Sequence, residues 1–246
     1  MRQGSSTLDA SIDVGLATTR AEFDAASRLV HACYVRRGYA RASGDGRHIS
    51  PYLAMPSTAV FVVRADGAVV ATVSLIVDSE LQLPCDALWG AELLAARAAG
   101  RRLAEVSALA VGEAWRGVRL GAVRALVRIV GVYGRELAGV DDLCIAVHPR
   151  HAPFYEARLR FQRFGGLVAY DAVNGAPAVG LWLDLRELDG ALDDSSFAGS
   201  VFNAEGRTRA RARLERDLHR VTRGDRPLQV LQAWPAVDAA DPAEVC

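Results

Sequence analysis

The sequence predicts a mixed α/β domain in which helices flank a central sheet, with a helical appendage at its C-terminal end. Two β-branched runs, residues 59–64 and 68–77, are joined by Ala65-Asp66-Gly67, a turn signal typical of a β-hairpin. An apolar strand pattern at 102–111 is followed by a glycine-containing turn and a helix pattern. Further strand and helix patterns alternate as far as residue 185, which favours a single mixed sheet.

The length and composition fit one domain of this kind. Of the 246 residues, 51% are hydrophobic, which is enough to bury a substantial core. The 29 basic and 29 acidic side chains balance, so no net field draws the chain to nucleic acid or to an anionic membrane. We expect a flexible leader at 1–11, the domain at 12–186, and a linker with an arginine-rich helix and tail at 187–246.

The four cysteines indicate a reducing compartment. Cys33, Cys85, Cys144 and Cys246 stand singly, without Cys-x-x-Cys spacing, which favours reduced thiols in the cytosol. The N-terminal residues lack the charged-then-apolar pattern of a signal peptide, and no stretch approaches the ~20 apolar residues that cross a bilayer. We therefore expect a cytoplasmic protein without integral membrane association.

The N-terminal elements begin with a short strand at 12–17. Thr19 and Glu22 then have the spacing of a capping box, which opens a helix whose apolar residues recur at helical spacing as far as Cys33. Residues 38–56 are rich in Gly, Ser, Pro and Arg, so we expect a loop that closes over a substrate. The hairpin at 59–77 follows.

The elements after the hairpin alternate between helix and strand. Asp86 is expected to cap a helix that ends at Gly100. A longer helix runs from Arg119 to Leu137 and stops near Gly139. The other predicted elements are strands at 102–111 and 143–147, a short helix at 150–159, and closing strands at 161–170 and 178–185.

The C-terminal segment predicts one further helix, with Leu214, Leu218 and Val221 on one face. Between residues 205 and 226, eight arginines face four acidic residues, enough for weak attraction to an anionic partner. The alternative is a solvated helix that packs its three apolar residues on the domain.

The strand at 104–111 and the glycines at 117 and 121 suggest an anion site at a helix start. Backbone N–H groups at a helix N-terminus are unsatisfied and the helix dipole is positive there, so a phosphate fits. Arg116 and Arg119 would add charge-assisted hydrogen bonds. The alternative is that Gly117 and Gly121 only permit a tight loop and close helix packing.

This loop resembles that of the GNAT superfamily, Arg/Gln-x-x-Gly-x-Gly/Ala, which binds the phosphates of an acyl donor. Alignment places Arg119 where the first loop glycine usually lies. That glycine lets the backbone approach a pyrophosphate, whereas a carrier-protein donor has one phosphate there and tolerates a looser loop. The resemblance implies an acyl-phosphopantetheine thioester, on acyl carrier protein or coenzyme A, as co-substrate. The residues implied in its binding are Leu109, Val111, Arg116, Gly117, Arg119, Leu120, Gly121 and Ala122.

Two segments narrow the resemblance: Pro149-Arg150-His151-Ala152-Pro153-Phe154-Tyr155, and Asn174-Gly175-Ala176-Pro177-Ala178-Val179. They look like the N-acyl amino acid synthase (FeeM-like) branch of GNAT proteins, over about residues 12–185. That branch is similar to the acyl-homoserine-lactone synthases, which share a strand like Glu105-Val106-Ser107, although Ala108 stands here in place of their arginine. The resemblance implies transfer of a long-chain acyl group to the amine of an amino acid.

Glu105 is the candidate general base. An acid within a largely apolar strand has a raised pKa, which suits it to take a proton from the amine, directly or through water. Strand alternation places Glu105, Ser107 and Leu109 on one face, and we take Ser107 as a second catalytic candidate. The alternative is a strand glutamate that faces solvent.

Tyr155 lies where a GNAT tyrosine commonly protonates the departing thiolate, although packing beside Phe154 is an alternative. GNAT strands also carry a bulge, here near residues 109–111, which frees a backbone N–H to polarise the thioester carbonyl.

The candidate acceptor-binding residues are Arg36, Tyr39, Arg150 and His151. Arginine suits an amino-acid carboxylate or an acidic carrier protein, and a solvated helix end is the alternative for the first two. His148 and His151 form a His-x-x-His pair without an evident third ligand, so we expect no metal.

The expected partners are an acyl carrier protein and an amino acid or small amine, but no nucleic acid. The competing functions are an acetyl-coenzyme-A-dependent acetyltransferase and a non-catalytic module that binds acyl ligands or carrier proteins.

Overall fold

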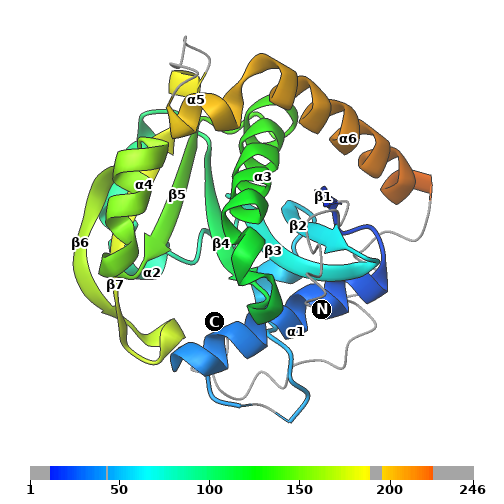
Figure 1. Ribbon diagram of the computed structural model, residues 1–246. Coiled ribbons are helices and arrows are strands. Elements are labelled where there is room, and N and C mark those ends of the chain that lie inside the picture. Colours follow the sequence, from blue (N-terminus) through cyan, green and yellow to red (C-terminus); the bar gives the residue numbers. More distant parts are fainter. Residues whose placement is uncertain (1–11, 43, 189–195, 224–246) are drawn as a thin grey trace.

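The computed structural model describes residues 12–42, 44–188 and 196–223. The leader predicted at 1–11 and the part of the tail at 224–246 lie outside these residues. Seven strands form one sheet in the order β1-β2-β3-β4-β5-β7-β6 (Figure 1). Only β4 and β5 are parallel neighbours. The strands are β1 (Asp13–Leu16), β2 (Thr58–Ala65), β3 (Ala68–Val77), β4 (Leu103–Val111), β5 (Asp142–Val147), β6 (Gln162–Tyr170) and β7 (Ala176–Asp184).

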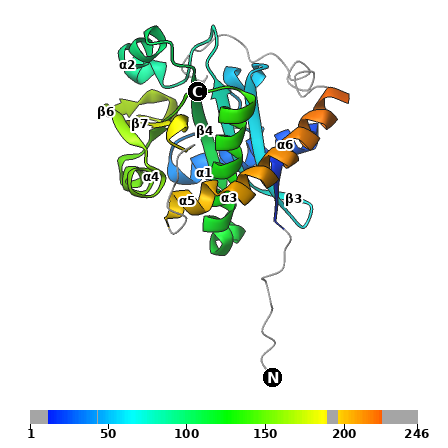
Figure 2. The same cartoon turned by 90° about the horizontal axis from the view of Figure 1, so that it is seen from above.

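Helices cover both faces of the sheet (Figure 2), which confirms the predicted mixed α/β sheet flanked by helices. The α2 helix lies on the opposite side of the sheet from α4 (Figure 2). None of the helices within the described ranges combines the length and the apolar character needed to cross a membrane. The helices are α1 (Arg20–Arg37), α2 (Asp86–Ala98), α3 (Arg119–Val132), α4 (Ala152–Leu159), α5 (Phe197–Phe202) and α6 (Ala204–Arg223).

Local sequence signals account for the first elements. Thr19 Oγ1 accepts a hydrogen bond from the Glu22 N–H while the Glu22 carboxylate accepts from the Thr19 N–H, so the predicted capping box opens α1. Asp66 and Gly67 both have positive φ, 50° and 77°, as a two-residue type I′ hairpin turn requires. The hairpin and the first helix are therefore confirmed.

The central strands are buried on both faces, with alternate residues serving different layers. Phe61 and Val63 belong to the main core under α3, whereas Val60 and Val62 pack with Ala26 of α1. This alternation follows from the two-residue period of a strand. Strand β2 therefore reads as a continuous apolar run, as expected for a strand between two helical layers.

The predicted start of α2 requires a correction. The helix begins at Asp86, but the N-cap position is Cys85, and Asp86 does not cap it. The Asp86 carboxylate instead turns back and accepts a hydrogen bond from the N–H of Leu83 at 2.8 Å. The predicted helix at 119–137 also divides, because α3 ends at Val132 and a wider π-helical turn covers Tyr133–Leu137.

The C-terminal helices pack as part of the main core. Val201, Phe202 and Leu214 are buried in the same cluster as the sheet and α3. The fully buried carboxylate of Asp217 in α6 accepts a hydrogen bond from the N–H of Leu16 in β1 at 3.0 Å. The predicted packing of the apolar face of this helix on the domain is thus observed, and the boundary at residue 187 stays a prediction.

The parallel pair at the centre of the sheet is short. Strand β4 pairs with β5 only through Leu103, Ala104 and Glu105, after which the two strands diverge. A β-bulge against β3 lies just beyond, where Ser107 opposes Ser74 but Ala110 opposes Thr72. The sheet therefore opens into a wedge whose closed end is at Glu105.

Candidate active site

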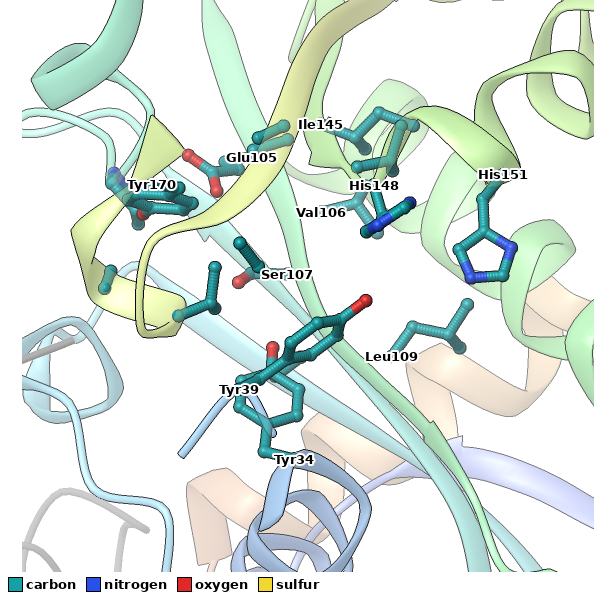
Figure 3. Close-up of a pocket in the computed structure, with 18 of the residues that line it drawn as sticks. Tyr34, Tyr39, Glu105, Val106, Ser107, Leu109, Ile145, His148, His151 and Tyr170 are labelled. Atoms are coloured by element: carbon teal, nitrogen blue, oxygen red, sulfur yellow. The ribbon is translucent and has the colours of Figure 1, made fainter. Parts of the chain in front are cut away.

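The wedge between β4 and β5 holds a cavity of about 650 Å³. Glu105 and Ser107 lie toward Tyr170, and Leu109 lies toward His151 on the other side of the cavity (Figure 3). Apolar side chains of the diverging strands line the space between them: Val106, Leu109, Val111, Ile145 and Val147. The cavity thus joins an apolar slot to a chamber with polar side chains, a combination typical of small-molecule sites.

The chamber is closed by the end of α1, the loop at 38–56 and the β6–β7 hairpin. The Asn174 amide of the hairpin turn donates a hydrogen bond to the Gly38 carbonyl oxygen at 3.0 Å, which joins the hairpin to the end of α1. His48, Ser50 and Tyr52 of the loop line the cavity. The loop therefore lies where the sequence analysis expected it, and its closing over a substrate stays a prediction.

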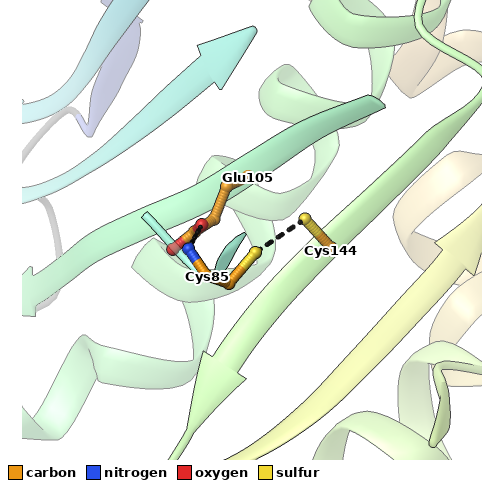
Figure 4. Close-up of side chains that lie close together, drawn as sticks. All are labelled: Cys85, Glu105 and Cys144. Atoms are coloured by element: carbon orange, nitrogen blue, oxygen red, sulfur yellow. Dashed lines mark hydrogen bonds between the residues drawn. The ribbon is translucent and has the colours of Figure 1, made fainter. Parts of the chain in front are cut away.

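Glu105 is 3% exposed and is the last residue of β4 that pairs with β5. Its carboxylate accepts a hydrogen bond from the Cys85 N–H at 2.8 Å (Figure 4). Burial raises the pKa of Glu105 to about 7; the Cys85 hydrogen bonds lower the pKa, and the charge of Asp86 raises it. The carboxyl group lines the cavity, so the solvent-facing alternative is wrong.

Two buried thiols lie beside this carboxyl group. The Sγ atoms of Cys85 and Cys144 are 3.4 Å apart, and both cysteines are reduced. The hydrogen bond to Cys144, together with burial, raises the pKa of the Cys85 thiol, which keeps it protonated. Cys85, Glu105 and Cys144 bring three potential donor atoms within 4.8 Å, the one group of this kind among the described residues. The expectation of no metal stays a prediction.

The bulge in β4 is centred on Ala108, which has a φ of 54°. Such a left-handed conformation is costly for a residue with a Cβ, so the strand holds a strained peptide here. Ser107, Ala108 and Leu109 all line the cavity. The structure therefore contains the bulge that the resemblance implied, one residue before the expected position.

Tyr155 of α4 lines the apolar part of the cavity. Its ring makes edge contacts with Phe154 and Phe161, with centroids 5.5 and 5.6 Å apart. The packing beside Phe154 is thus observed, and protonation of a departing thiolate by Tyr155 stays a prediction.

The predicted phosphate loop forms a 3₁₀ turn at Glu113–Val118 that leads into α3. The side chains of residues 116–119 lie outside the described part of the structure. Leu120 is 60% exposed and lines the cavity, and Gly121 is exposed, whereas Ala122 is buried in the main core. Phosphate binding by this loop stays a prediction.

The predicted acceptor residues divide into two groups. Tyr39 and His151 line the cavity, whereas Arg36 and Arg150 do not. Arg36 pairs with Glu113 at 3.3 Å, and Arg37 lines the cavity instead. Arg150 donates to the Nε2 atom of His151 at 3.2 Å and to the Tyr39 hydroxyl oxygen at 3.5 Å, so it bonds to two residues that line the cavity.

Several polar residues of the chamber were not predicted from the sequence, among them His48, Tyr52 and Tyr170. His48 packs on Tyr34 with ring centroids 5.1 Å apart, and burial lowers the pKa of His48 to about 4. Burial raises the pKa of Tyr34 to about 12. Both rings are therefore neutral at physiological pH. The cluster of aromatic and histidine side chains within the loop at 38–56 was the signal available in the sequence.

Comparison with protein families identifies the family of the chain that forms this cavity. The family model of the N-acyl amino acid synthase FeeM matches residues 25–184, which span α1 to the end of β7. The chain belongs to this family. A search among curated protein sequences found no match.

Solved structures agree with membership of the FeeM family. FeeM from uncultured soil microbes is 30% identical, with a TM-score of 0.66 over 74% of this chain and 94% of FeeM. The coenzyme-A-dependent acyl-homoserine lactone synthase BjaI is 16% identical, with a TM-score of 0.53 over 82% and 99% of the two chains. The lactone synthase LasI is 17% identical, with a TM-score of 0.53 over 71% and 89%. The last two show a shared fold.

Proposed function

We propose that this chain is an acyltransferase that moves an acyl group from a phosphopantetheine thioester to the amine of an amino acid, giving an N-acyl amino acid. The observation that carries the proposal is the position of Glu105. Its buried carboxyl group lies where an apolar slot between two diverging strands meets a polar chamber. Membership of the FeeM family supports the same reaction.

The reaction is a direct transfer without a covalent enzyme intermediate. Glu105 takes a proton from the acceptor ammonium group, directly or through water. The amine nitrogen attacks the thioester carbonyl, and the bulge at residues 108–109 offers a backbone N–H to the developing oxyanion. The C–S bond then breaks while the C–N bond stays, and the Tyr155 phenol gives its proton to the departing thiolate. The second proton leaves the new amide nitrogen and restores the Tyr155 phenol through water.

The donor is a long-chain acyl carrier protein or acyl-coenzyme A, and its phosphate lies at the start of α3. Leu109, Val111, Ile145 and Val147 supply an apolar path for the acyl and pantetheine groups. Ser107 and Tyr39 contribute polar groups to the acceptor side, and His151 lies toward Leu109 on the other side of the cavity (Figure 3). We add Arg37 as the candidate partner of the acceptor carboxylate. A cytoplasmic location agrees with the reduced cysteines of the described residues.

Mass spectrometry of small-molecule products tests the proposal. The protein is incubated with long-chain acyl carrier protein, long-chain acyl-coenzyme A or acetyl-coenzyme A, each with a pool of amino acids. We expect an N-acyl amino acid from a long-chain donor, which Glu105→Gln abolishes and the exposed control Glu205→Gln in α6 retains. Product from acetyl-coenzyme A alone would identify an acetyltransferase, and binding without product from any donor would indicate a non-catalytic module.

A further inference from the structure

The loop between β3 and α2 holds the carboxyl group of Glu105. Strand β3 ends at Val77 and α2 begins at Asp86, so the loop is short. Its last residue, Cys85, donates its N–H to the Glu105 carboxylate at 2.8 Å. The position of this N–H therefore depends on what holds the two ends of the loop.

Arg97, near the end of α2, contacts both ends of this loop. Its guanidinium group donates two hydrogen bonds to Asp78, at 2.6 and 3.0 Å, and two to Asp86, at 2.7 and 2.6 Å. Asp78 lies directly after β3, and its N–H donates to the Leu103 carbonyl oxygen of β4 at 3.0 Å. We name Asp78, Arg97 and Asp86 the aspartate–arginine cluster.

A break in α2 makes this cluster possible. In a straight helix, eleven residues separate two positions by about 16 Å along the axis, too far for Arg97 to reach Asp86. Trp89 has non-helical backbone angles, φ −138° and ψ 44°, so the first turn departs from the direction of the rest of the helix. The cluster is also mostly buried, with side-chain exposures of 21% for Arg97, 19% for Asp78 and 9% for Asp86.

We propose that Arg97 is a positioning residue for acyl transfer: by binding Asp78 and Asp86 together, it holds the loop that presents the Cys85 N–H to Glu105. This inference rests on the proposed function of Glu105 as the base. Arg97 does not line the cavity and acts only through the aspartate–arginine cluster.

Loss of Arg97 changes the surroundings of Glu105 in two ways that act in the same direction. The Cys85 N–H, which favours the charged carboxylate, is held less firmly, and the charge of Asp86 is no longer balanced. Both changes disfavour the carboxylate. The other titratable groups around it are the Cys85 thiol, which belongs to the loop, and Cys144 of β5, Tyr34 of α1 and Tyr170 of β6, which lie outside the loop.

The test compares Arg97→Met with Arg101→Met in the full-length enzyme. Arg101 is a matched control, because it pairs with Asp142 and with Asp184 and is 16% exposed, but does not contact the loop before α2. We expect Arg97→Met to move the acidic limb of the pH profile of kcat/KM upward by about one pH unit, a loss of about tenfold at pH 6. At pH 9 the two variants should differ by less than about threefold, since Glu105 is ionised in both.

A titration that does not require activity separates the outcomes. The carboxyl ¹³C signal of Glu105, assigned with Glu105→Gln, is followed against pH in both variants. Coincident titrations of Arg97→Met and Arg101→Met would overturn the positioning role, whereas full activity of Glu105→Gln would overturn the proposed base instead. If Arg97→Met does not fold, Arg97→Lys keeps the charge but loses the paired hydrogen bonds, and it should shift the titration upward by a smaller amount.

Discussion

Glu105 sets the expected pH dependence of the reaction. Because burial raises its pKa to about 7, kcat/KM should rise with pH through about 7 and level off above that value. Glu105→Gln should lower kcat/KM by about 10²- to 10⁴-fold and remove this limb. Steady-state kinetics from pH 5.5 to 9 check both effects, with Glu205→Gln as the control that keeps the pH-dependent rise. A wild-type profile that is flat between pH 6 and 8 would contradict the assignment.

The same pKa predicts how stability depends on pH. Between the ordinary pKa of 4.5 and about 7, the folded state binds more protons at Glu105 than the unfolded state does, so this residue lowers stability as pH rises. Above pH 7 the cost is roughly 3 kcal/mol, which Glu105→Gln avoids. Denaturant unfolding should show the variant more stable than wild type at pH 8.5 and equal to it at pH 4. A stability difference that is the same at both pH values would refute this prediction.

Ala108 carries the strain of the bulge in β4. With a φ of 54°, its side chain costs about 1–2 kcal/mol relative to an unstrained residue. Ala108→Gly should therefore stabilise the protein by about 0.5–1 kcal/mol, after the greater flexibility of unfolded glycine is subtracted. Ala110→Gly, two residues along the same strand and 3% exposed, is the control and should destabilise it by about 1 kcal/mol. Equal changes in melting temperature for Ala108→Gly and Ala110→Gly would show that Ala108 is not strained.

At the scale of elements, the link between α6 and β1 makes a specific prediction. Asp217 is fully buried, accepts the Leu16 N–H and pairs with Arg213. Asp217→Ala leaves both donors without their carboxylate and should cost about 3 kcal/mol. The control is Glu205→Ala in the same helix, where both side chains of the ion pair are 74% exposed and the expected cost is under about 0.5 kcal/mol. If Asp217→Ala and Glu205→Ala unfold at the same urea concentration, the contact between α6 and β1 contributes nothing to stability.

Most elements could be predicted because their signals are local. The capping box at Thr19, the turn at Asp66-Gly67 and the two-residue period of β2 all act within a few residues of the chain. The role of Asp86 could not be predicted. Its carboxylate does not cap α2, because it accepts hydrogen bonds from Arg97, which comes close only where α2 is broken. The burial of α6 also depends on a contact between residues 201 positions apart.

In the candidate site too, only residues with a local sequence signal could be predicted. Glu105 was found because an acid in an apolar strand is unusual whatever the fold. His48 and Tyr170 were not predicted, because only the fold brings the loop at 38–56 and the β6–β7 hairpin to the same cavity. Arg36 and Arg37 are neighbours in sequence, and their helical positions alone decide which one reaches the cavity.

For the whole molecule, the residues that match the family model end before the residues that form the main core. The match ends at residue 184, whereas Val201, Phe202 and Leu214 complete the main core. A chain that ends at Glu187 should therefore lose cooperative thermal unfolding, since these buried side chains contribute about 1.5–3 kcal/mol each. Circular dichroism of the shortened chain checks this, and a melting temperature equal to that of the full chain would show that the domain ends at residue 187.

The divergence of β4 and β5 also bears on aggregation. A strand edge with free N–H and C=O groups attracts other strands, and proteins usually protect such edges at their periphery. Here two unused edges face each other inside one molecule, enclosed by α1, the loop at 38–56 and the β6–β7 hairpin. A small extended ligand can reach them, but the strand of another protein cannot. In the proposed acyl transfer, these backbone hydrogen-bonding groups would serve the substrate without exposing a strand edge to neighbouring proteins.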